Sequence, residues 1–191
     1  MSARTTGPAA AQRGIALVTS LLLLIIITIL ALSMFRGFGI QEKIAGNLRE
    51  KDRALHAAES AQQYGEWWLT QGNNAAIGAV ACAATLNANL GQGQICNLTP
   101  ANAGIIVTQV PWNIGVTYTP PNMSVMGAGV NAPNQYFQTP AFYIADLGLA
   151  ADAAGEAYQI DAYGYGGAAG TVAVVESTYE VQQGVVNRGG L

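Results

Sequence analysis

Few side chains in this sequence are suited to catalysis. His56 is the only histidine, and no nucleophile motif such as GxSxG places a serine or cysteine beside it. Neither a phosphate-binding loop nor a zinc-ligand spacing occurs in the sequence. We therefore interpret His56, three residues before Glu59, as a packed or exposed helix residue. The sequence predicts no enzymatic activity, no catalytic residue and no cofactor.

The two cysteines, Cys82 and Cys96, are the next candidates for chemistry. Two thiols without CxxC spacing are too few for a structural zinc site. If this part of the chain lies outside the cytoplasm, a disulfide is the natural interpretation, and it stabilises the fold by roughly 3 kcal/mol. The alternative is a pair of reduced, buried thiols.

Four acids fall close together in the second half of the chain: Asp146, Asp152, Glu156 and Asp161. Calcium is one interpretation, but the EF-hand pattern is absent, so we expect solvated turn acids and no metal site. Only 10% of all residues are charged, and beyond residue 67 Arg188 is the single base. Because nucleic-acid binding needs a basic face, we exclude a nucleic-acid partner.

A long uncharged segment near the N-terminus predicts a membrane helix. Residues 14–35 carry no charge, and a helix from Ile15 to Phe35 spans roughly 30 Å, the thickness of a bilayer core. A secretory signal cleaved after Ala31-Leu32-Ser33 is the alternative, although its apolar core is usually shorter. Because Arg4 and Arg13 precede the segment, we expect a cytoplasmic N-terminus and residues 36–191 on the other side of the membrane.

The residues after the membrane segment predict a second, amphipathic helical stretch that ends near Leu69. Its apolar positions recur with a period close to 3.6, so they are expected to pack on another element. These positions are Ile40, Ile44, Leu48, Leu55, Ala58 and Leu69, widened by Ala54 and Ala61.

The remaining residues predict a small antiparallel sheet after an irregular region with one short helix near 75–86. Turn residues separate the strand-like runs, and the last three are close enough to form a meander. The runs are 105–110, 114–119, 141–147, 157–164 and 171–182. In the last run Val172 and Val174 share one face, with Val175, Tyr179 and Val181 on the other. The sequence thus predicts an α+β head, a sheet packed on the amphipathic helix.

Two clusters on the amphipathic stretch have a structural and a functional interpretation. Tyr64, Trp67 and Trp68 are expected to anchor the core of the head, with a recognition surface as the alternative. The mixed charges at residues 49–53 are expected to form a solvated helix face, with ion pairs to neighbouring subunits as the alternative.

This arrangement resembles that of type IV pilins and the related pseudopilins. The stretch QRGIALV resembles a prepilin peptidase site, which implies cleavage between Gly14 and Ile15 and methylation of Ile15. The stretch IQEKIAGNLREKDRALHAAE, from Ile40 to Glu59, is similar to a segment of PilX-type minor pilins. The closing run YQIDAYGYGGAAGTVAVVESTYEV also resembles the PilX ending. The resemblance covers residues 13–69 and 157–181.

The resemblance implies a division of the chain into four segments: a leader at 1–14, a transmembrane and assembly helix at 15–36, the amphipathic half of that helix at 37–70, and a periplasmic or extracellular head at 71–191. The fifth mature position, usually glutamate in pilins, is Thr19 here. In the family this glutamate is thought to neutralise the amine of a neighbouring subunit. A subunit without it is suited to the end of a filament, because a buried unpaired ammonium is costly.

The function implied is that of a minor pilin that primes or caps type IV pilus assembly at the tip and supports adhesion, twitching motility and presentation of a PilY-type tip adhesin. The implied partners are other minor pilins, that adhesin, prepilin peptidase and the inner membrane. The implied location is the inner membrane before assembly and the pilus tip afterwards. Two alternatives stay open: a K-like minor pseudopilin of type II secretion, and a head that binds a surface ligand directly.

Overall fold

The computed structural model describes residues 13–82, 86–87, 95–126 and 135–182. One helix is followed by a 3₁₀ turn and six strands: α1 (Arg13–Thr70), η1 (Asn74–Ile77), β1 (Leu86–Asn87), β2 (Ile95–Cys96), β3 (Gly115–Thr117), β4 (Ala141–Leu149), β5 (Gly155–Tyr165) and β6 (Val172–Gln182). The chain divides into two units, Met1–Asn47 and Leu48–Leu191, and the helix runs through both. Residues 1–12, most of the expected leader, lie outside the described residues.

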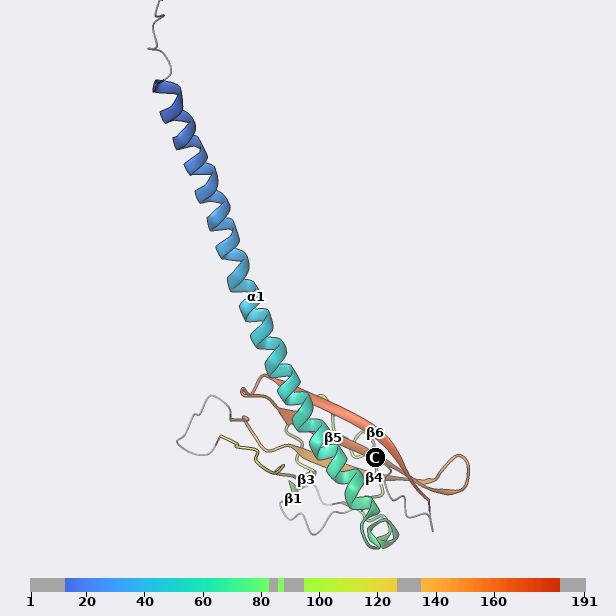
Figure 1. The fold of residues 1–191 in the computed structure, drawn as a ribbon. Helices are drawn as coiled ribbons and strands as arrows, with labels where there is room; N and C mark the ends of the chain where they lie inside the picture. Colours follow the sequence, from blue (N-terminus) through green and yellow to red (C-terminus); the bar gives the residue numbers. More distant parts are fainter. Residues whose placement is uncertain (1–12, 83–85, 88–94, 127–134, 183–191) are drawn as a thin grey trace, which may run out of the picture. The chain divides into compact units, whose positions relative to one another are not determined.

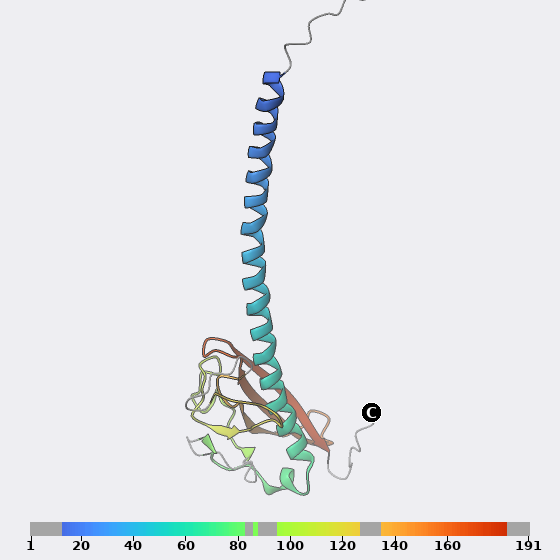
Figure 2. The ribbon, with the colours of Figure 1, turned by 60° about the vertical axis from the view of Figure 1, so that its left-hand side comes forward.

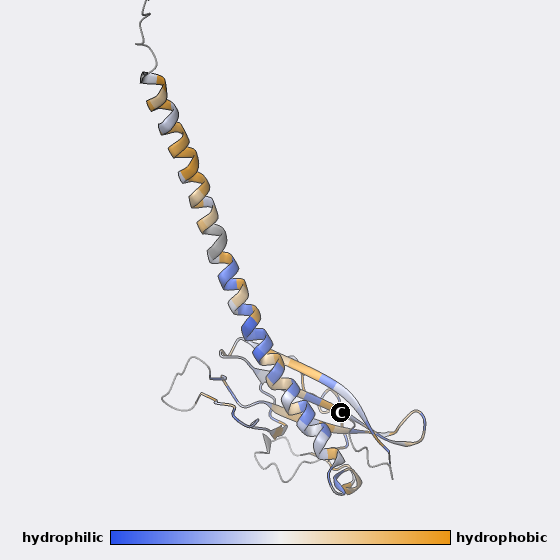
Figure 3. Ribbon diagram, in the orientation of Figure 1, coloured by the Kyte–Doolittle hydropathy of each residue, from blue (hydrophilic) through white to orange (hydrophobic). Residues whose placement is uncertain are grey.

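The first unit contains the uncharged part of α1, which is long and apolar enough to cross a membrane. Figure 3 shows this part of α1 as predominantly hydrophobic and the following turns as hydrophilic. The hydroxyl of Thr28 donates a hydrogen bond to the carbonyl of Ile25 (2.8 Å), and that of Ser33 to the carbonyl of Ile29 (2.9 Å). Polar side chains in this segment are therefore satisfied by their own helix, which lowers their cost in lipid.

Helix α1 ends where the backbone enters the left-handed region. Gly72 has φ 54°, a conformation that a glycine adopts without a steric penalty. The side-chain amide of Asn74 then donates to the carbonyl of Trp68 (2.8 Å), which also accepts from the backbone N–H of Gln71 (3.1 Å), so this carbonyl at the end of the helix is satisfied without a regular helical partner. The short helix expected near 75–86 is wrong beyond Ile77, where η1 ends; residues 83–85 are outside the described part.

The second unit is built on a mixed sheet with the strand order β1-β3-β4-β5-β6, with β2 pairing on β4 (Figures 1 and 2). The expected meander is confirmed, because β4–β5 and β5–β6 are both antiparallel. The expectation of a purely antiparallel sheet is wrong, since β1 pairs with β3 and β2 with β4 in parallel. The expected strand at 114–119 is reduced to β3.

One face of the sheet packs on α1, and the contact is made by small helix residues. The buried positions of the helix are Ala54, Ala57, Ala58, Ala61, Gly65, Trp68 and Leu69. A Cβ atom added at Gly164 of β5 would lie 2.5 Å from the backbone nitrogen of Ala58 and 2.7 Å from the Cβ of Ala57. Helix and strand therefore approach as closely as a glycine permits.

This packing corrects the predicted apolar stripe. Ala54, Ala58, Ala61 and Leu69 are buried as expected, but Leu48 is 60% exposed and Leu55 is 38% exposed. Ile40 and Ile44 are also exposed. Leu48 and Leu55 thus lie to one side of the small-residue face that meets the sheet, whereas Ile40 is exposed although it is in helical phase with the buried Ala58.

The other face of the sheet is also covered, so the head has more than the two layers expected. Trp112 is buried edge-on against Tyr163 of β5, with ring centroids 4.9 Å apart. Its indole N–H donates to the carbonyl of Val107 (3.0 Å). The strand expected at 105–110 is wrong, because the segment forms turns, with the N–H of Gln109 bonded to the carbonyl of Ile106. Val172 and Val174 pack on this face, and Val175, Tyr179 and Val181 on the α1 face, as predicted.

Candidate functional site

The sequence-predicted processing residues lie at the start of α1. Gly14 and Ile15 are in the first turn, and the side chain of Ile15 is exposed. The hydroxyl of Thr19 donates to the carbonyl of Ala16 (3.0 Å), so this position supplies no charge. The first acid of the helix is Glu42. The N-terminal part of α1 therefore contains nothing that could neutralise a neighbouring ammonium group.

A line of large apolar side chains remains exposed along α1 beyond the uncharged segment. It consists of Ile40, Ile44, Leu48 and Leu55, which recur at helical spacing. We call these four residues the exposed line. Burying one such side chain is worth roughly 1.5 to 3 kcal/mol, so the line favours contact with another apolar surface.

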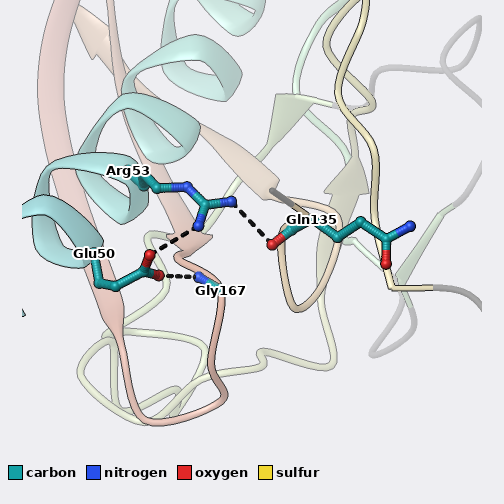
Figure 4. Close-up of polar contacts among 4 residues, drawn as sticks. All are labelled: Glu50, Arg53, Gln135 and Gly167. Atoms are coloured by element: carbon teal, nitrogen blue, oxygen red, sulfur yellow. Dashed lines mark hydrogen bonds and ion pairs between the residues drawn. The ribbon is translucent and has the colours of Figure 1, made fainter. Parts of the chain in front are cut away.

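The junction between α1 and the sheet is a polar cluster (Figure 4). The carboxylate of Glu50 accepts a hydrogen bond from the N–H of Gly167 (2.5 Å). It also forms an ion pair with the guanidinium of Arg53 (2.8 Å). Arg53 also donates to the carbonyl of Gln135 (2.9 Å), and its guanidinium lies 4.7 Å from the centroid of the Tyr136 ring. The helix is thereby fixed both to the β5–β6 turn and to the segment that begins at Gln135.

This cluster corrects the interpretation of residues 49–53 as a wholly solvated face. Arg49, Lys51 and Asp52 are exposed, whereas Glu50 and Arg53 are half-buried. The N–H of Gly167, followed by the Arg53 side chain, holds the pKa of Glu50 below its ordinary value. A signal was present in the sequence: Glu50 and Arg53 each lie four residues before a buried alanine, Ala54 and Ala57, on the face that meets the sheet.

The four acids expected in solvated turns do not behave alike. Asp146 and Asp152 accept hydrogen bonds from the N–H groups of Gly148 (2.7 Å) and Ala154 (3.0 Å), as turn acids do. Glu156 accepts from the hydroxyl of Tyr158 (2.8 Å). The described residues hold no group of three or more potential metal ligands. Asp146, Asp152 and Glu156 thus each accept a hydrogen bond from a group two residues further along the chain.

Asp161 contradicts the prediction, because it is 1% exposed on the face of β5 that points away from α1. Its Oδ2 accepts from the amide of Gln159 (2.9 Å), and Oδ1 has no hydrogen-bond partner among the described residues. Its cross-strand neighbours are Tyr143 on β4 and Glu176 on β6. Burial raises the pKa of Asp161 to about 6, and the negative charge of Glu176 acts in the same direction.

The remaining candidates are distributed over the second unit. His56 is exposed and lies 3.3 Å from a carboxylate oxygen of Glu59. Of the two tryptophans near the end of α1, Trp68 is buried in the core as expected, whereas Trp67 is 53% exposed. Cys82 and Cys96 are joined by a disulfide bond, which links the segment after α1 to β2.

Comparison with known families gives one match. Residues 13–62 match the family model described as PilX N-terminal. The match contains the uncharged segment, the exposed line, and both Glu50 and Arg53, and it ends before the sheet begins. No curated protein and no solved structure matches the chain.

The junction makes a testable contribution to stability. We expect Glu50→Gln to lower the free energy of unfolding by about 1 kcal/mol, because it removes the charge from the hydrogen bonds to Gly167 and Arg53. The measurement is urea unfolding of the full chain in detergent micelles, followed by tryptophan fluorescence. Since folding depresses the pKa of Glu50, the difference from the unmodified protein should shrink as the pH falls below 4.5, the ordinary value for this side chain. Asp52→Asn, at an exposed position of α1, is the matched control; equal losses in both variants would contradict the role of the junction.

Asp161 makes the stability of the head depend on pH in the direction opposite to that expected for Glu50. Because folding raises its pKa from 3.8 to about 6, the head should lose stability as the pH rises between these values. Asp161→Asn should remove this slope and raise the free energy of unfolding at pH 7 by on the order of 2 kcal/mol. Thermal unfolding of the full chain from pH 4 to pH 7 measures both effects. Asp152→Asn, at an exposed turn, should keep the slope, and a slope that survives in Asp161→Asn would refute the assignment.

Proposed function

We propose that this chain, a PilX-like type IV pilus minor pilin, primes or caps pilus assembly from the filament tip. The minor-pilin assignment rests on the match over residues 13–62. The observation that carries the more specific proposal is the character of α1, which exposes large apolar side chains along its length and has no acid before Glu42.

Processing is the first step of the proposal. Prepilin peptidase removes residues 1–14 and methylates Ile15, so that residues 15–36 become the membrane and assembly segment. Residues 37–70 continue the helix, and residues 71–191 form the head outside the cytoplasm. The exposure of Gly14 and Ile15 supports this proposal, since a peptidase must reach the backbone between them.

Lateral packing of α1 drives assembly in this proposal. Extraction of the apolar segment from the bilayer requires another apolar surface in place of lipid, and the helices of neighbouring pilins supply it. The exposed line extends this contact beyond the membrane segment, where lipid is no longer present. The head then supports presentation of a PilY-type adhesin and, through it, adhesion and twitching motility.

The absence of the acid at Thr19 restricts the subunit to an end of the filament. Inside a filament each helix start meets a neighbour's ammonium group, and a neutral hydroxyl already bonded to Ala16 cannot neutralise it. At the tip no such partner is required. The inner membrane before assembly and the tip afterwards are therefore the proposed locations.

The mass of the N-terminal peptide tests processing directly. Membranes from cells that contain the native prepilin peptidase should yield a peptide that begins at methylated Ile15. Gly14→Val should leave the full-length precursor and abolish assembly, whereas Gly46→Val, at an exposed helix position with free space around it, should be processed normally.

An intact N-terminus in the unmodified protein would refute the pilin role and leave a plain membrane anchor. A start after Ser33 would indicate a secreted protein. Recovery of the processed chain in a secretion pseudopilus rather than in pili would favour the K-like alternative.

The role of position 19 predicts a change of location. Thr19→Glu should be processed normally and should appear along the shaft, because the restored carboxylate can pair with a neighbour's ammonium group. Immunogold labelling of sheared pili measures the distribution. Thr19→Gln, which has the same shape without the charge, is the control and should stay at the tip. Tip-only labelling of Thr19→Glu would show that the missing acid does not set the location.

A further inference from the structure

Strand β6 forms one border of the sheet, and no described segment pairs with its outer edge (Figures 1 and 2). Its eleven residues are all in register with β5, from Val172 opposite Tyr165 to Gln182 opposite Gly155. In an antiparallel ladder, residues alternate in the side to which their N–H and C=O groups point. About half of the residues of β6 therefore direct both groups outward, away from β5.

Apart from two glutamates, this edge lacks the features that usually prevent strands from pairing there. Natural sheets protect their edges with prolines, lysines, bulges or very short strands. Strand β6 contains no proline, lysine or arginine, and its register with β5 has no bulge. At the opposite end of the strand order, the described part of the chain gives β1 two residues. Within the described residues, β6 therefore presents the longer regular edge.

The charges along β6 restrict what can pair with it. Glu176 and Glu180 are exposed on the face that points away from α1. On the α1 face, Ser177 donates a hydrogen bond to Glu66 (3.0 Å), which places a third carboxylate beside the strand. The sequence contains no lysine or arginine between Arg53 and Arg188. Each ionised group along the described strand is therefore negative.

A second copy of β6 is a poor partner for this edge. Antiparallel pairing centred on Thr178 would place Glu176 opposite Glu180 of the other copy, twice. Like charges directly opposite each other destabilise a strand pair. A strand with basic side chains on the same face would instead gain from both carboxylates.

We propose that the outer edge of β6 binds an extended basic segment of another protein, which adds to the sheet as a further strand. Backbone hydrogen bonds to the outward groups of β6 hold the segment. Lysine or arginine side chains at alternate positions pair with Glu176 and Glu180 and select it. The inference does not rest on the pilus role, since it follows from the edge and charges of the head.

The first test uses the purified full chain in a non-ionic detergent and fluorescent peptides long enough to span β6. A peptide of alternating lysine and valine should bind, measured by fluorescence anisotropy, and should slow amide hydrogen exchange in residues 172–182. The corresponding glutamate–valine peptide should bind at least about tenfold more weakly. A lysine–valine peptide with every second amide N-methylated should also fail, because it cannot form the ladder.

The second test reverses the charges on the strand. Glu176→Lys with Glu180→Lys should weaken binding of the lysine–valine peptide by about tenfold or more and improve binding of the glutamate–valine peptide. Asp52→Lys with Asp152→Lys changes the net charge equally at exposed positions outside β6, and this variant should bind as the unmodified protein does.

Three results would overturn the proposal. Equal binding of the N-methylated peptide would mean attraction to charge alone, and unchanged exchange in β6 would place the peptide elsewhere. Rapid formation of disulfide-linked dimers by the Thr178→Cys variant would show that the edge pairs two copies of this chain.

Discussion

The close approach of α1 to the sheet is the constraint on which the rest of the second unit depends. Ala57 and Ala58 of the helix meet Gly164 of β5 with no room for another carbon atom. Small residues at this contact bring the polar junction within reach, because Glu50 can bond the N–H of Gly167 only if the helix lies this near. The same choice of residues directs the larger side chains of α1, Leu48 and Leu55, away from the sheet.

The helix therefore separates two kinds of contact that a single amphipathic face usually combines. The alanine face stabilises the head within one chain, whereas the exposed line remains available for other helices. In the proposed minor-pilin role this separation would have a physical advantage, because contacts that assemble subunits could form and break while the head stays folded. The match to the PilX N-terminal family covers both faces of the helix but not the sheet.

The sheet departs from a simple apolar layer in two places, and both involve acids. Asp161 lies between its cross-strand neighbours Tyr143 and Glu176, on the face of the sheet that also carries Trp112. Burial there makes its charged form energetically costly and raises its pKa. At the border, Glu176 and Glu180 line a regular strand edge that disfavours self-pairing and leaves the backbone groups open to a basic strand. Glu176 lies at both places, opposite Asp161 on β5 and on the border strand β6.

The sequence alone determined the features that depend on local pattern. The uncharged segment, the α+β class and the three-stranded meander follow from length, charge and periodicity within short windows, whereas the PilX-like stretch was identified by resemblance and lies within the matched residues 13–62. Only the tertiary structure decided which helix face meets the sheet, that 105–110 forms turns beneath Trp112, and that Asp161 is buried while Asp152 is not. The reason is that periodicity identifies apolar positions but not the surfaces they contact. Which apolar positions of a helix are buried depends on the shape of the surface that packs against them.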